Sequence, residues 1–83
     1  MEPSDGGELT IDELARAAGT VVSTIRLYQH RGLLPPPTKR GRVGYYGQHH
    51  VGRLAAIDKL QERGFSLAGI KALLDGVESG TSL

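Results

Sequence analysis

Apolar residues recur at helical spacing near the start of the 83-residue chain. The first apolar stripe consists of Ile11, Leu14, Ala15 and Ala18. Thr10 and Glu13 have the spacing of a capping box at the start of this stripe, and Gly19 provides a left-handed stop after it. The pattern therefore predicts a short first helix of about two turns.

A second helix is predicted over about residues 22–31, ending at Gly32, after a tight turn that contains Gly19. Val22 and Ile25 would face the core, together with Leu33 and Leu34 beyond the helix end. Two short helices joined by such a turn form a helix-turn-helix, whose second helix can lie in the major groove of DNA.

Pro35-Pro36-Pro37 cannot continue a helix and should hold the chain extended. Residues 38–40 and 43–46 then have the composition of two short strands around a turn near Gly41. Because Arg40 and Arg42 fall at the tip of this hairpin, we expect a basic wing over about residues 38–46.

The helical period returns after the wing, in two further segments. The first contains Val51, Leu54, Ile57 and Leu60, and the second contains Leu67, Ile70, Leu73 and Leu74. Gly64 ends the third predicted helix, and Ser66 caps the fourth. The sequence thus predicts a mainly α fold, a winged helix-turn-helix over residues 9–75, with flexible ends at residues 1–8 and 76–83.

The net charge of +1 hides a strong separation of charge along the chain. No Asp or Glu occurs between Leu14 and Ile57, whereas that stretch holds seven of the ten Lys and Arg and all three His. Such a cationic face attracts polyanions, because binding releases the counterions condensed on nucleic-acid phosphates.

The composition argues against several other functions. With no Cys, the chain offers no disulfide and no thiolate metal site. It has no paired carboxylates, no Ser-His-Asp ordering and no glycine-rich phosphate loop, so we expect neither an enzyme nor a bound cofactor. No apolar run approaches the length of a membrane span, and the acidic start lacks the features of a signal peptide, so we expect a soluble cytoplasmic protein.

His49 and His50 raise the question of a metal site. Adjacent residues on a helix diverge by about 100°, which suits two ligands of one ion poorly, so we expect no metal. We place both residues in the first turn of the third helix, with His50 positioned to donate to a phosphate.

The candidate DNA contacts are Ser23, Thr24, Arg26, Tyr28, Lys39, Arg40, Arg42 and Tyr45. Arg26 has no acid within a helical turn, so its guanidinium is available either to a guanine edge or to a phosphate. Tyr28 could pack its ring and reach a phosphate through its hydroxyl, and Ser23 could instead serve the start of the helix. Of Tyr45 and Tyr46, one should pack on the core and the other face DNA, because neighbouring strand residues point to opposite sides.

Four stretches together resemble the DNA-binding domain of MerR-family transcription regulators: TIDELARAAG, STIRLYQHRGLLPPP, RVGYY and LQERGFSLAGIKALL. The most specific part runs from Thr24 to Pro36 and is followed by Gly-Phe-Ser-Leu at Gly64 to Leu67. The resemblance covers about residues 9–75 and implies the same winged helix-turn-helix. It also implies that Thr24, Arg26 and Tyr28 face DNA and that the wing around Arg40 and Arg42 contacts the backbone.

The chain departs from the family pattern at two places. Leu27 stands where members often have an aromatic residue, and the wing reads RVGYY, which moves its arginine, Arg42, to the tip.

The resemblance implies sequence-specific binding of double-stranded DNA at a promoter or operator, in the cytoplasm and without a membrane. Family members continue into a dimerising coiled-coil helix and an effector-binding region, so this chain is either the DNA-binding part of a longer homodimer or a small binder that pairs on DNA, monomeric by itself. Two other functions fit the same basic face: an excisionase-like or architectural DNA-binding factor, and a protein-interaction adaptor with an acidic partner.

Overall fold

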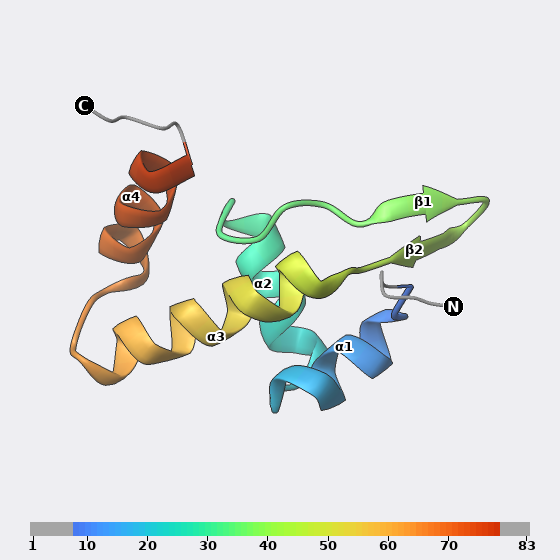
Figure 1. Cartoon of the computed structure of the whole chain (residues 1–83), viewed down its shortest axis with the longest axis horizontal. Coiled ribbons are helices and arrows are strands. Elements are labelled where there is room, and N and C mark those ends of the chain that lie inside the picture. The colour runs from blue at the N-terminus through green and yellow to red at the C-terminus, as the bar shows by residue number, and fades with distance from the viewer. Residues whose placement is uncertain (1–7, 79–83) are drawn as a thin grey trace.

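The computed structural model describes residues 8–78, with side chains described as far as Gly76 (Figure 1). Four helices and one hairpin follow each other along the chain. They are α1 (Ile11–Ala18), α2 (Val22–His30), β1 (Thr38–Arg40), β2 (Val43–Tyr45), α3 (Gln48–Glu62) and α4 (Leu67–Glu78). This order confirms the predicted helix, helix, wing, helix, helix arrangement.

The ends of α1 follow the predicted sequence signals. The Glu13 N–H donates to Oγ1 of Thr10 over 3.2 Å, and the Thr10 N–H donates to Oε1 of Glu13 over 2.9 Å, which completes the capping box. Gly19 ends the helix at a φ of 69°, a left-handed conformation that glycine adopts without steric strain. The chain then turns directly into α2, forming the helix-turn-helix.

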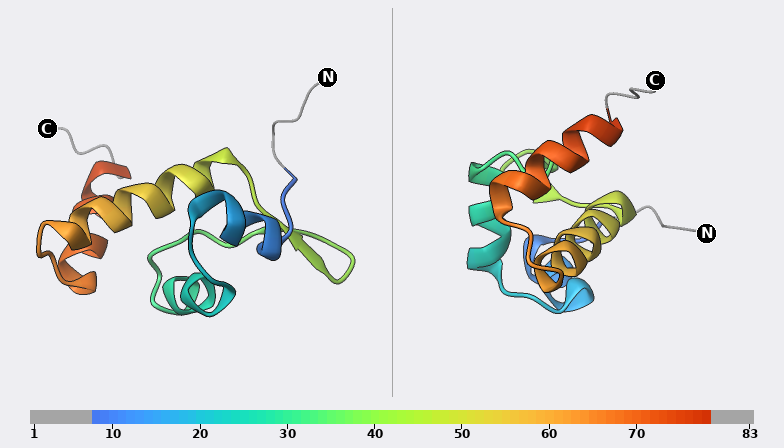
Figure 2. Two further views of the ribbon diagram at one scale, coloured as in Figure 1. Left: turned by 90° about the horizontal axis from the view of Figure 1, so that it is seen from below. Right: turned by 90° about the vertical axis from the view of Figure 1, so that its left-hand side faces the viewer.

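Helix α3 runs along the middle of the molecule, with α4 at one end and the wing extending beyond the other (Figures 1 and 2). The predicted cap of α4 is present, since the Gly69 N–H donates to Oγ of Ser66 over 3.1 Å. Helix α4 continues through Gly76, where the prediction began a polar tail. Gly76 has no positive φ and so provides no left-handed stop. The ends predicted to be flexible lie largely outside the described residues.

The wing is a two-stranded antiparallel hairpin whose register pairs Thr38 with Tyr45, Lys39 with Gly44 and Arg40 with Val43. Its turn contains Gly41 at a φ of 64°, where a side chain would be strained. Beyond the predicted second strand, Tyr46 forms an isolated bridge with Leu9. The Leu9 N–H donates to the Tyr46 carbonyl over 2.9 Å, and the Tyr46 N–H returns a bond of 2.8 Å. The residue just before the cap of α1 is therefore fastened to the base of the wing.

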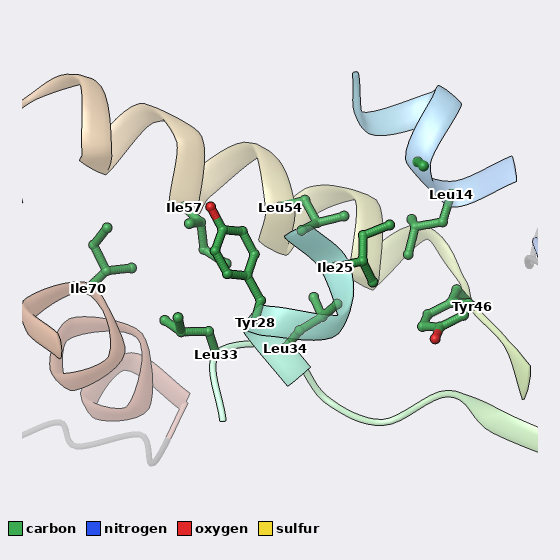
Figure 3. Packing of buried hydrophobic residues seen from close by; sticks show 10 residues of the cluster. Leu14, Ile25, Tyr28, Leu33, Leu34, Tyr46, Leu54, Ile57 and Ile70 are labelled. Atoms are coloured by element: carbon green, nitrogen blue, oxygen red, sulfur yellow. The ribbon is translucent and has the colours of Figure 1, made fainter. Parts of the chain in front are cut away.

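One apolar core joins all four helices (Figure 3). Its buried members are Leu14, Ala15, Ile25, Tyr28, Leu33, Leu34, Tyr46, Leu54, Ile57 and Ile70. Burial of Leu33 and Leu34 confirms the prediction that the chain after α2 returns to the core. Among residues 8–78, none of the helices has the length and apolar character needed to cross a membrane.

Candidate nucleic-acid interface

Helix α2 buries one face and exposes another, and the division follows from its sequence. Ile25 and Tyr28, three positions apart, lie on the same side of the helix and pack in the core (Figure 3). Arg26 follows Ile25 by about 100° around the helix axis and is exposed to solvent. The guanidinium that the sequence singles out is therefore on the outer surface of the helix.

A groove separates α2 from the wing and gathers positive charge. It encloses about 450 Å³, and both elements supply cations to it: Arg26 from α2, and Lys39 and Arg42 from the wing. Neither Asp nor Glu lines it. The geometry thus places Arg26 beside the basic hairpin.

Strand alternation divides the two cations of β1 between opposite sides of the wing. Lys39 and its partner Gly44 face the groove, whereas Arg40 lies in a second hollow together with Tyr45. In that hollow Arg40 forms an ion pair with Glu8, and its guanidinium carbon lies 5.3 Å from the centre of the Tyr45 ring. The structure therefore does not bring Arg40 or Tyr45 to the groove that holds Arg26.

Ser23 and Thr24 lie in the first turn of α2. Ser23 is exposed and Thr24 is half-buried, and neither of them lines the groove. Ser23 lies three positions before Arg26, on the same side of α2 and one turn nearer its start, whereas Thr24 lies about 200° around the helix from Arg26.

Tyr28 takes the packed alternative that the sequence left open. Its side chain is only 8% exposed, and its hydroxyl donates to Oε1 of Gln61 on α3 over 3.1 Å. Burial and the nearby carboxylate of Asp58 raise the pKa of this hydroxyl above its ordinary value of 10.0. Because the hydroxyl is already used inside the protein, we leave Tyr28 out of the candidate interface.

The expectation that His50 donates to a phosphate is wrong. Its side chain is 2% exposed, and both ring nitrogens lie within hydrogen-bonding distance of backbone groups. Burial and the neighbouring ring of His49 lower the pKa of His50 below its ordinary value of 6.5. Within the described part of the chain, no group of three or more His, Cys, Asp or Glu is arranged to hold a metal ion.

Tyr45 and Tyr46 divide as strand alternation predicts, with Tyr46 in the core and Tyr45 half-buried under Arg40.

Gln29 lines the groove although it was not among the candidate contacts. It lies three positions after Arg26, on the same side of α2, so helical spacing alone could have identified it. The Tyr46 hydroxyl donates to Oε1 of Gln29 over 3.4 Å, which connects the side of α2 that carries Arg26 to the base of the wing.

Comparison with known proteins agrees with this architecture. Residues 9–77 match the family described as MerR HTH family regulatory protein. The chain belongs to the MerR family. The mercuric resistance operon regulatory protein of Serratia marcescens is 48% identical over 67 residues, which are 80% of this chain and 46% of that protein.

Two solved structures share the fold of this MerR-family chain. PbrR691 of Ralstonia metallidurans CH34, crystallised in complex with lead(II), superposes with a TM-score of 0.83 at 30% identity, over 89% of this chain and 59% of that one. HiNmlR, a MerR family regulator lacking the sensor domain and bound to promoter DNA, gives a TM-score of 0.78. The two chains are 24% identical, and the superposition covers 89% of this chain and 60% of HiNmlR. At that identity the likeness shows a common fold.

Family membership favours a transcription regulator over an architectural factor or a protein adaptor. The chain spans about half the length of the curated relatives that it matches.

Proposed function

We propose that this chain is the DNA-reading part of a transcription regulator, with α2 in the major groove and the wing on the adjacent backbone. One observation carries the proposal: Arg26, Lys39 and Arg42 line a single groove between α2 and the wing, and no acidic residue lines it. Cations on two adjoining elements can contact a base edge or phosphate and a neighbouring stretch of backbone at the same time.

The dimensions of DNA support this placement of α2. The major groove of B-DNA, about 12 Å wide, admits an α-helix, and its base edges are read by arginine and glutamine side chains. Arg26 and Gln29 are the side chains of α2 that reach the basic groove. Ser23 and Thr24, at the start of the helix, would contact the flanking phosphates.

We assign the two sides of the wing different roles. Lys39 and Arg42 face the groove and are the proposed phosphate contacts. Arg40 is held by Glu8 and stacks on Tyr45. Arg40 and Tyr45, both predicted to contact DNA, would therefore support the shape of the wing rather than bind phosphate directly.

The proposal includes pairing of two copies on an operator. A dimer of helix-turn-helix units binds two half-sites about one helical turn apart, which gives the operator two-fold symmetry. The signal that controls the regulator would be sensed by a region outside this chain. The chain would bind DNA in the cytoplasm, without catalysing a reaction.

The proposal can be tested without knowing the operator. Purified protein is incubated with a library of random-sequence duplexes, and the bound fraction is amplified and sequenced over several rounds. We expect enrichment of one palindromic sequence. Recovery of unrelated duplexes only would support architectural binding, and no recovery above a protein-free control would favour an adaptor.

Arg26 is the first residue to test on the enriched duplex. Arg26→Ala should weaken specific binding by about 1–3 kcal/mol if the guanidinium reads a base. Arg63→Ala is the matched control, since it removes the same charge from the exposed far end of α3. Equal weakening of Arg26→Ala on the enriched and on random duplexes would instead indicate a phosphate contact.

The two sides of the wing give a second test, by fluorescence anisotropy at increasing salt. Each phosphate contact contributes about −0.9 to the slope of log affinity against log salt concentration. Arg42→Ala should make the slope shallower by about one contact. Arg40→Ala should change the slope less, and a larger change for Arg40 than for Arg42 would contradict the assigned sides.

A further inference from the structure

The imidazole of His50 lies where the two ends of the wing meet. Pro35-Pro36-Pro37 leads into β1, and Gly47 follows β2 at the start of α3. Nδ1 of His50 lies 3.0 Å from the Gly47 nitrogen, and Nε2 lies 3.1 Å from the Pro35 carbonyl and 3.3 Å from the Pro36 carbonyl. One buried side chain therefore joins the entry of the wing to its exit.

These contacts require one protonation state of the ring. The Gly47 N–H is a donor, so Nδ1 must accept and cannot carry a proton. The proline carbonyls only accept, so Nε2 must carry the proton and donate. The neutral ring protonated at Nε2 can make the hydrogen bonds to Gly47 and to the proline carbonyls together. A second proton, on Nδ1, would place an N–H of the ring against the N–H of Gly47, and neither group could accept.

The groups around the ring give a positive charge little compensation. Tyr46 packs edge to face against it, with ring centres 4.9 Å apart, and its hydroxyl is bonded to Gln29. The ring of His49 lies 4.0 Å away, centre to centre.

The carboxylates of Glu8 and Asp75 already have cationic partners. Glu8, which shares the outer hollow with His50, is paired with Arg40. Arg53, one turn along α3, lies 3.8 Å from Asp75, measured between Nη2 and Oδ1, and donates from Nε to the Leu33 carbonyl. Among the residues that the structure describes, a second proton on His50 would thus be buried without a free carboxylate beside it.

We propose that His50 is a positioning residue that holds the wing against the start of α3, and that proton uptake by its imidazole loosens the wing and weakens DNA binding. The DNA part of this inference rests on the proposed function, whereas the tether itself does not. Protonation removes the acceptor for Gly47, so the connection that His50 makes between Gly47 and the proline segment is broken at the base of the wing, while the pairing of β1 with β2 remains. Lys39 and Arg42 then lose their fixed distance from Arg26.

The tether can be tested on the protein alone by ¹⁵N NMR of the histidine rings between pH 8 and pH 4. We expect His50 to show the neutral Nε2–H form at pH 7 and to bind a proton only below its ordinary pKa of 6.5. Its titration should shift the amide signals of Gly47 and Gly44 together. A His50 ring that takes up a proton without moving the Gly47 signal would overturn the tether.

Two variants test whether the tether affects DNA binding. In His50→Gln, the amide oxygen can accept from Gly47 and the amide N–H can donate to a proline carbonyl, but the group does not titrate. His49→Gln removes the exposed neighbour and keeps the tether. Affinity for a labelled random-sequence duplex is measured for all three proteins from pH 7.5 to 5.0 at constant salt.

We expect the affinity of the wild type relative to His50→Gln to fall by up to about tenfold per pH unit below the pKa of His50. His49→Gln should retain the fall, moved to slightly higher pH because His49 no longer disfavours the second charge. Parallel pH profiles for the wild type and His50→Gln would overturn the effect on DNA binding. Absence of duplex binding by all three proteins would instead refute the proposed function, and the NMR titration would still decide the tether.

Discussion

At the scale of single residues, neighbours on α2 have opposite surroundings. Arg26 is exposed on the groove, while Tyr28, two positions later, is buried against α3. Their spacing rotates the second side chain by about 200° around the helix. A motif that contains both residues therefore combines one surface residue with one core residue.

Replacement of Tyr28 by phenylalanine tests this separation. Tyr28→Phe removes the hydrogen bond to Gln61 and keeps the packed ring, so the free energy of unfolding should fall by about 0.5–1.5 kcal/mol. Urea denaturation measures this change, and DNA affinity should remain that of the wild type. A loss of affinity at unchanged stability would show that the hydroxyl contacts DNA.

At the scale of elements, the wing depends on contacts outside its own strands. Each strand has three residues, and an isolated two-stranded hairpin of this kind is at best marginally stable in water. The backbone of Leu9 and the packing of Pro37 against Gly44 supply further contacts. The position of the basic tip is therefore set by the base of the wing.

A pair of glycine variants tests this dependence. A Cβ at Gly44 would come within 2.8 Å of Cγ in Pro37, so Gly44→Ala should displace the strands and cost about 1–3 kcal/mol of stability. DNA affinity should fall with it. The control is Gly52→Ala in α3, where a Cβ meets no atom within 4 Å and better helix propensity should add about 0.5–1 kcal/mol. Thermal unfolding and anisotropy distinguish the two, and equal effects would contradict the role of the Pro37 contact.

Helix ends and apolar periods made most of these elements predictable from the sequence. Thr10, Gly19 and Ser66 act locally, so their spacing alone determines where helices begin and end. The side of the wing on which Arg40 lies could not be predicted, because it depends on the pairing of two strands. Burial of His50 depends on proline carbonyls 14 and 15 positions earlier, which no local pattern reveals.

At the scale of the whole molecule, two buried titratable side chains make the stability of the fold depend on pH. Burial lowers the pKa of His50 and raises that of Tyr28, in each case favouring the neutral form in the folded chain. In the unfolded chain, His50 takes up a proton below about pH 6.5 and Tyr28 loses one above about pH 10. Both changes stabilise the unfolded state.

Stability should therefore be highest between these two limits. As the pH falls below about 6.5, the free energy of unfolding should decrease until folded His50 also binds its proton. As the pH rises past about 10, it should decrease again because folded Tyr28 retains its proton. Urea midpoints across this range measure both limbs. His50→Gln should flatten the acid limb and Tyr28→Phe the alkaline limb, and an acid limb unchanged in His50→Gln would contradict the first assignment.

The backbone bridge between Leu9 and Tyr46 has a practical consequence for handling the protein. A protease site or affinity tag placed immediately before Leu9 would add peptide directly next to the backbone pair at the base of the wing. Trimming that removes Leu9 would delete two hydrogen bonds and free the main-chain groups of Tyr46. Preparations used to compare operators should therefore share the same amino-terminal processing, checked by intact mass.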